Sequence, residues 1–186
     1  MSEQLLVAML AKTRGMLSTA KQPLADFHLV SGGSAWCDHL AVTLYLETIL
    51  HQPFGSLTLH LPCAFDVKQR CFQQSHPCGA VLNQLHEEFR LKTGRDALHE
   101  LAAAIHLGAK VKMYNDFGSR NAGIAEEVDQ LFAFSWSDSG HPEKGGTLDT
   151  WNKFSGMRLH IPIRSLVVTP ETAVSAKAAV EEKSKL

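Results

Sequence analysis

Three turns rich in glycine and serine carry the residue types that could bind an anionic group. They are Ser31-Gly32-Gly33-Ser34, Gly118-Ser119-Arg120-Asn121 and Gly145-Gly146-Thr147. A helix that begins after such a turn points free backbone N–H groups and the positive end of its dipole at the turn, where a phosphate is bound favourably. The first turn is neither a GxGxxG motif nor a Walker loop. It could therefore also be a tight turn that only joins a strand to a helix.

Arg120 is the side chain best suited to hold a phosphate, because a guanidinium beside a helix N-terminus can form two parallel hydrogen bonds to it. The alternative is a surface salt bridge with Glu126 or Glu127. Asn121 could contact the ligand, or it could shape the turn by a hydrogen bond to the local backbone. Asp38 could accept a hydrogen bond from a ribose hydroxyl, or it could simply favour a helix start.

Aromatic side chains near these turns could contact a base. Trp36 could stack on it or pack in the core, and Trp136 and Trp151 flank the loop 137–146 and could wall the pocket. No catalytic residue is assigned. The predicted ligand contacts are Ser31, Gly32, Gly33, Ser34, Trp36, Asp38, Phe117, Arg120, Asn121, Gly145, Gly146, Thr147 and Thr150.

Apolar patterns predict the elements that position these turns. Helices are expected over residues 2–17, 35–50, 79–92, 95–106 and 147–154, and a further helix is expected to begin with Ser119 as its N-cap. Strands are expected over 27–30, 56–61, 111–114, 131–134 and 158–163. This alternation predicts an α/β fold, a Rossmann-like three-layer sandwich with a mostly parallel central sheet of about five strands. Ligands bind such sheets beyond the carboxyl ends of the strands, so the three turns should converge on one crevice.

The chain divides by composition into three parts. We expect an N-terminal helix and connector over residues 1–26, one nucleotide-binding domain over 27–168, and a C-terminal tail over 169–186. Thr169 and Pro170 could begin a last helix. Its Ala/Glu/Lys composition buries little, so a frayed or disordered tail is expected. Residues 63–78 are expected to form a long loop.

The bulk composition excludes some classes of function. The 186 residues are 45% apolar and 20% charged, which is ordinary for a soluble globular protein. A net charge of −1 argues against binding to a nucleic-acid backbone. No apolar run could span a membrane, and the N-terminus shows no secretory signal. The four cysteines form no CxxC pair, so reduced thiols in the cytoplasm are expected.

The ten histidines raise the question of a metal. His60, Cys63, Cys71, His76 and Cys78 fall in one segment, but no pair has the regular spacing of a zinc site. The sequence therefore predicts no metal and no cofactor.

Together the three turns resemble the SLOG superfamily of Rossmann-like domains, which groups DNA-processing protein A with the lysine-decarboxylase-like LOG proteins. The matching residues are Ser31-Gly32-Gly33, Phe117-x-x-Arg120-Asn121-x-x-Ile124-Ala125 and Gly145-Gly146-Thr147, within residues 27–163. The resemblance implies binding of a nucleotide, a nucleotide-derived molecule or single-stranded DNA. Some members cleave nucleoside monophosphates at the N-glycosidic bond with a glutamate, and Thr150 stands where that glutamate would fall.

Three functions therefore remain open at this stage. The first is a module that binds a nucleotide or nucleotide-derived small molecule. The second is a phosphoribohydrolase-like enzyme, in which Asp38, Asp149 or a glutamate in the crevice would stabilise an oxocarbenium-like transition state. The third is a single-stranded nucleic-acid binder that stacks bases on Trp36 or Trp136, against which the near-neutral charge argues. A homo-oligomer is compatible with all three.

Overall fold

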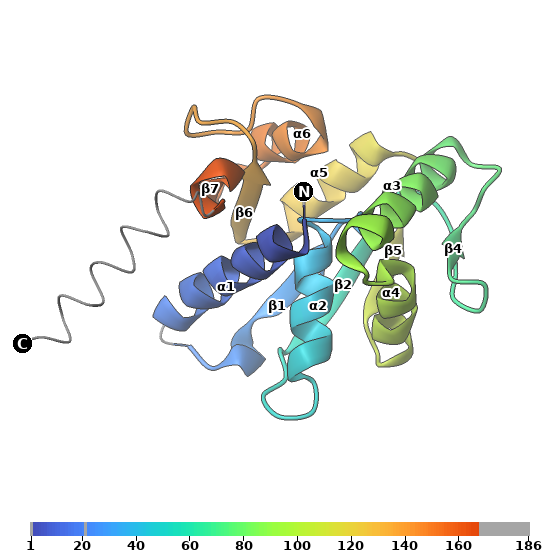
Figure 1. Cartoon of the computed structure of the whole chain (residues 1–186), viewed down its shortest axis with the longest axis horizontal. Coiled ribbons are helices and arrows are strands. Elements are labelled where there is room, and N and C mark those ends of the chain that lie inside the picture. Colours follow the sequence, from blue (N-terminus) through green and yellow to red (C-terminus); the bar gives the residue numbers. More distant parts are fainter. Residues whose placement is uncertain (1, 21, 168–186) are drawn as a thin grey trace, which may run out of the picture.

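A computed structural model describes residues 2–20 and 22–167 of the chain. Helices alternate with strands that pair mostly in parallel, which confirms the α/β class (Figure 1). The helices are α1 (Glu3–Thr19), α2 (His39–Thr48), α3 (Pro77–Thr93), α4 (Ala97–His106), α5 (Phe117–Glu127) and α6 (Gly145–Lys153), with 3-10 turns η1 (Leu24–Asp26) and η2 (Ile163–Leu166). The strands are β1 (His28–Ser31), β2 (Ser56–Leu61), β3 (Phe65–Asp66), β4 (Cys71–Phe72), β5 (Lys110–Met113), β6 (Gln130–Ser135) and β7 (Met157–Pro162).

The parallel strands form two sheets, so the prediction of one central sheet of about five strands is wrong. The central sheet has three strands in the order β1-β2-β5, and β6 and β7 form a separate parallel pair. Leu59 of β2 lies opposite Ser31 on one side and Val111 on the other. Within this part of the chain β1 and β6 each pair on one side only, and both line the same cavity. The cavity thus lies where a continuous sheet would join the two strands.

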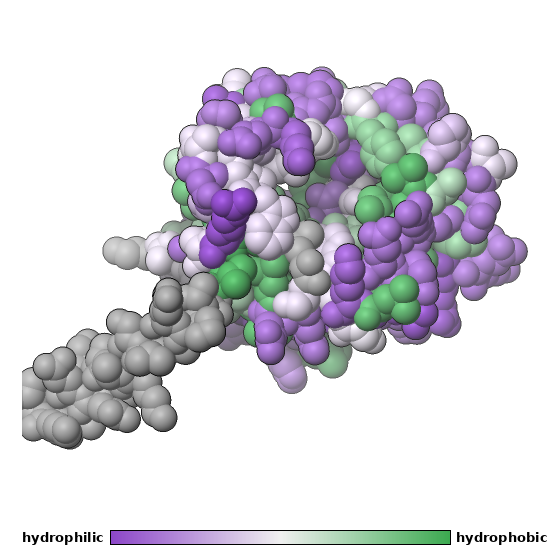
Figure 2. Space-filling view, turned by 45° about the horizontal axis from the view of Figure 1, so that its top comes forward, coloured by the Kyte–Doolittle hydropathy of each residue, from purple (hydrophilic) through white to green (hydrophobic). Residues whose placement is uncertain are grey.

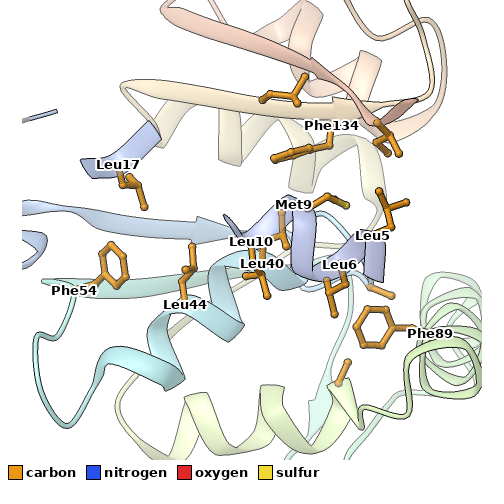
Figure 3. Close-up of a cluster of buried hydrophobic side chains, with 14 residues drawn as sticks. Leu5, Leu6, Met9, Leu10, Leu17, Leu40, Leu44, Phe54, Phe89 and Phe134 are labelled. Atoms are coloured by element: carbon orange, nitrogen blue, oxygen red, sulfur yellow. The ribbon is translucent and has the colours of Figure 1, made fainter. Parts of the chain in front are cut away.

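Helix α1 packs through one apolar face against α2 and α3 on one side and against the β6–β7 pair on the other (Figure 3). The side chains at helical spacing are all buried: Leu5, Leu6, Met9, Leu10 and Leu17. The Ser2 hydroxyl accepts a hydrogen bond from the Leu5 N–H and caps the helix. In Figure 3 Met9 lies beside Phe134 of β6, while Leu10 lies beside Leu40 of α2. Burial of each such side chain contributes about 1.5–3 kcal/mol, so α1 holds the two sheets together.

Strand β2 is buried on both faces, although its alternating sequence is typical of a strand with one polar face. The buried polar face carries His60, which is fully enclosed beneath α5. Its two ring nitrogens contact Glu127 Oε2 at 2.6 Å and the Tyr114 hydroxyl at 2.9 Å. Residue 123 lies so close to that hydroxyl that a Cβ on Gly123 would be 2.0 Å from the Tyr114 oxygen, which explains the glycine. These partners satisfy the polar face and fix α5 over β2.

Several predicted boundaries differ from the structure. The helix expected over 35–50 begins only at His39, because residues before it form a loop with Gly33 and Trp36 at positive φ (68° and 66°). The N-cap of α5 is Asp116, whose carboxylate accepts from the Ser119 N–H at 2.7 Å, so the prediction of Ser119 as the cap is wrong. The connection 63–78 contains a short antiparallel hairpin, β3–β4, in addition to loops.

The predicted tail 169–186, with its helix starting at Thr169, lies outside the described residues. Among the described helices none is long and apolar enough to cross a membrane. No group of three or more metal-ligating side chains occurs in residues 2–20 and 22–167.

Candidate functional site

A cavity of about 970 Å³ lies between β1 and β6. The three predicted turns meet at its rim, at the carboxyl ends of these strands. In the space-filling view the surface is hollowed between the part that contains α6, β6 and β7 and the rest of the molecule (Figure 2). The predicted ligand contacts that line the cavity are Gly32, Ser34, Trp36, Asp38, Phe117, Arg120, Asn121, Gly146, Thr147 and Thr150. Ser31, Gly33 and Gly145 lie beside the cavity without lining it.

Arg120 lies on the cavity wall with only 6% of its surface exposed. Its Nη1 donates to Asp38 Oδ2 at 3.0 Å, and its guanidinium carbon lies 5.5 Å from the centre of the Phe117 ring. Its Nε–H is buried and has no hydrogen-bond partner among the described residues. A buried donor without an acceptor is costly, typically about 1–3 kcal/mol. The Nε atom is itself closed to solvent, so an anion in the cavity would reach it only after the side chain moves.

The glycine at position 32 leaves room for the guanidinium. A Cβ built on Gly32 would lie 1.5 Å from Arg120 Nη1 and 2.6 Å from Asp38 Oδ2. The backbone of the first turn therefore packs directly against the Arg120–Asp38 ion pair. The salt bridge expected with Glu126 or Glu127 is absent among the described contacts, and Asp38 takes that place.

Hydrogen bonds from both sides hold the first turn. The Ser31 hydroxyl donates to the Asp38 carbonyl at 2.8 Å and accepts from the Gly33 N–H at 3.1 Å. His86 Nε2 lies 3.1 Å from the Gly33 carbonyl oxygen. Burial lowers the pKa of His86 to about 4, so the ring is neutral at pH 7 and donates from Nε2. Ser31 and Gly33 thus shape the turn rather than face the cavity.

Asn121 links the second turn to the third. Its Nδ2 donates to Asp149 Oδ2 at 2.9 Å and lies 3.5 Å from the Gly146 carbonyl oxygen. Asp149 also accepts from Lys153 Nζ at 2.6 Å, and the Thr150 hydroxyl donates to Gly146 O at 3.1 Å. The alternative in which Asn121 bonds only to its local backbone is therefore wrong. These bonds fix the N-terminus of α6 at the cavity.

The first turn of α6 offers backbone donors that no side chain caps. The N-cap position is Lys144, which forms no capping hydrogen bond. Gly146 and Thr147 lie in this first turn and line the cavity. The free N–H groups and the helix dipole favour an anion here, beside Asn121, which follows Arg120 in α5.

The three tryptophans differ in their relation to the cavity. Trp36 lines it and packs edge-on against Phe89, with ring centres 4.8 Å apart. Trp136 is 46% exposed, and Trp151 stacks with the Arg158 guanidinium at 4.8 Å. Neither belongs to the lining, so the expectation that they wall the pocket is wrong.

The cavity extends further than the sequence predicts. It continues along β1 and β6 to their amino ends, where its lining includes Asp26, His28, Glu127 and Asp129. No motif marks these residues, because they become neighbours only through the gap between the two sheets. The available signal in the sequence was that acidic residues, Asp26 and Asp129, stand just before two of the predicted strands.

Nucleophilic chemistry finds little support at the site. Burial, followed by the charge of Asp38, raises the pKa of the Cys37 thiol to about 12. The thiol is therefore protonated, and it contacts the Phe134 carbonyl oxygen at 3.7 Å. The two carboxylates near the rim, Asp38 and Asp149, are both ion-paired. Either of these two carboxylates would have to leave its ion pair to act as a general base.

No protein-family model matches the chain. No solved structure gives a significant match. Uncharacterized protein R261 of Acanthamoeba polyphaga mimivirus is 44% identical over 126 residues, which cover 67% of this chain and 64% of the viral protein. The matching region thus spans a little less than two thirds of that relative, whose name states no activity.

Proposed function

We propose that the protein binds a nucleotide or nucleotide-derived small molecule in the cavity between β1 and β6. The observation that carries the proposal is that Arg120 and the uncapped first turn of α6 line the same cavity. A phosphate held by this guanidinium would also reach the uncapped first turn of α6 at Gly146 and Thr147.

Asp38 completes the proposed site. Its carboxylate neutralises part of the Arg120 charge, yet a third of its side chain stays exposed at the cavity. A ribose hydroxyl could donate to that exposed oxygen while the phosphate contacts the amides of α6. Because Arg120 and Asp38 nearly cancel, the affinity for phosphate would come mainly from directed N–H donors rather than net charge.

We also propose that the two sheets correspond to the halves of a Rossmann-like sheet in the order β5-β2-β1-β6-β7, opened between β1 and β6. This arrangement, together with the three turns, supports membership of the SLOG superfamily. It puts the proposed phosphate site at the carboxyl ends of β1 and β6, where ligands bind in open α/β sheets.

Thermal unfolding with and without AMP, ADP-ribose and cyclic AMP tests the proposal. A ligand at a hundred times its dissociation constant adds about 2.7 kcal/mol, which corresponds to a rise of roughly 5–10 °C in Tm for a domain of this size. Arg120→Gln should abolish the rise, and Arg90→Gln, which changes an exposed arginine paired with Glu87, should leave it intact. If no nucleotide raises Tm, or if Arg120→Gln responds like the wild type, the assignment is wrong.

A further inference from the structure

The cavity has two chemically different ends. At the carboxyl ends of β1 and β6 it presents Arg120 and the amides of α6. At the amino ends its lining contains three carboxylates: Asp26, Glu127 and Asp129. Arg120 is the one lysine or arginine among the described lining residues. A molecule that fits along this cavity would carry an anion at one end and hydrogen-bond donors at the other.

At the end of the cavity formed by the amino ends of β1 and β6, Glu127 is held in place as a hydrogen-bond acceptor. Lys112 Nζ, at 2.7 Å, and His60 Nε2, at 2.6 Å, both contact its Oε2. Burial alone would raise the pKa of Glu127, but these two hydrogen bonds outweigh burial and lower it. The second oxygen, Oε1, has no hydrogen-bond partner among the described residues. Glu127 is therefore ionised and has one oxygen left for a donor.

Asp129 and Asp26 add acceptors at the same end. Neither carboxylate forms an ion pair within residues 2–20 and 22–167, and both residues are exposed at the cavity mouth. They come from opposite sides of the gap, Asp26 from the turn before β1 and Asp129 from the turn before β6. A donor group that enters the mouth would meet carboxylates on both sides.

The distance between the two ends fits a nucleoside monophosphate. Arg120 and Glu127 lie seven positions apart on α5, which is about 10 Å along the helix axis. This is roughly the span from the phosphorus atom of such a nucleotide to the far edge of its base. Between the ends the lining is apolar, with Leu29 and Leu40 on one side and Phe132 on the other, as a flat base requires.

We infer that the ligand's base carries an exocyclic amino group, which donates hydrogen bonds to Glu127 and Asp129. The inference rests on the proposed function and adds the specificity of the same cavity. Carboxylates accept from the amino groups of cytosine and adenine, whereas an oxo group in the same place would face them with a second acceptor. Bases with an oxo group at this position are therefore excluded by repulsion as well as by the missing hydrogen bond.

Titration calorimetry with matched ligand pairs tests the inference on the full chain. AMP should bind at least about tenfold more tightly than IMP, and CMP more tightly than UMP. Each pair exchanges an amino group for an oxo group, which also places a proton on the adjacent ring nitrogen. Ribose 5-phosphate, which has no base, measures the phosphate end alone. Equal affinities within both pairs would overturn the inference while binding of ribose 5-phosphate upheld the proposed function. If none of the five ligands binds, the proposed function and the inference both fail.

Two substitutions assign the discrimination to these carboxylates. Asp129→Asn and Glu127→Gln together should reduce the AMP/IMP ratio to about one and leave the affinity for ribose 5-phosphate unchanged. Glu126→Gln is the matched control, since Glu126 is exposed on the same helix and does not line the cavity. Asp129→Asn alone should lower the ratio if Glu127→Gln weakens folding through His60. A ratio that survives in Asp129→Asn and in the folded double variant would refute the assignment.

Discussion

Substitution of Gly32 by alanine probes the contact on which the site depends. The new Cβ would lie 1.5 Å from Arg120 Nη1, and ordinary contact begins near 3.4 Å, so the guanidinium must move by about 2 Å. Its distance from Asp38 Oδ2 would grow from 3.0 Å to roughly 5 Å. At an effective dielectric constant of about 20 this weakens the attraction by about 2 kcal/mol. The value is an upper bound, because Asp38 is one-third exposed and screened by water.

A gain in the unfolded state offsets part of this loss, since alanine restricts the unfolded chain by about 0.4–1 kcal/mol relative to glycine. Gly32→Ala should therefore lower the stability by about 1 kcal/mol, a fall of roughly 2–4 °C in Tm. Gly15→Ala is the matched control. Gly15 lies in α1 with open space around its Cα, so alanine should raise the stability by about 1 kcal/mol.

Circular dichroism during heating measures both variants under the same conditions. The expected signature is a change of opposite sign for two identical substitutions. A Gly32→Ala protein as stable as Gly15→Ala would show that the guanidinium does not pack on this turn. Shifts of the same sign in both variants would likewise refute the proposed arrangement of Arg120 and Asp38.

Three further predictions test the packing around the site. Gly123→Ala should destabilise the protein by about 1–3 kcal/mol in urea unfolding, because its Cβ would lie 2.0 Å from the Tyr114 hydroxyl; a neutral result would place that side chain elsewhere. Because burial lowers the pKa of His86 from 6.5 to about 4, the neutral ring stabilises the fold above pH 6.5, and up to about 3 kcal/mol should be lost as the pH falls from 6.5 to 4. His86→Gln, which keeps a donor for Gly33 O, should flatten that part of the pH–stability curve, and an unchanged slope would contradict the assignment. Met9→Ala should cost about 2–5 kcal/mol in the same assay, since Met9 is fully buried, and a cost below 1 kcal/mol would disprove its place in the core.

The sequence predicts single elements well where a local pattern decides them. The boundaries of β2 agree with the prediction to the residue, because Pro62 ends a clear alternation. The first helix agrees to within two residues at its C-terminus, because its apolar side chains keep one period over the whole length. The convergence of Gly32, Arg120 and Gly146 at one cavity is also present. That these residues bind a ligand stays a prediction.

Features that depend on distant partners were not predictable. The gap between β1 and β6 is a matter of which strands pair, and nothing in either strand's own sequence encodes it. Asp116 and Ser119 are both good N-caps three positions apart, so sequence could not choose between them. His60 appeared to belong to a solvent-facing side of a strand, but Glu127, far along the chain, allows it to be buried.

The position of α1 has a consequence for how binding preferences could change. This helix packs against α2, which belongs to the three-stranded sheet, and also against the β6–β7 pair. The size of its apolar side chains should therefore set the separation of the two sheets and the width of the cavity between them. Replacing Leu10 or Met9 by a bulkier or slimmer residue would alter that width without touching any ligand. A relative with different apolar side chains in its first helix would then bind a wider or narrower ligand, even if every residue at the rim of the cavity were the same.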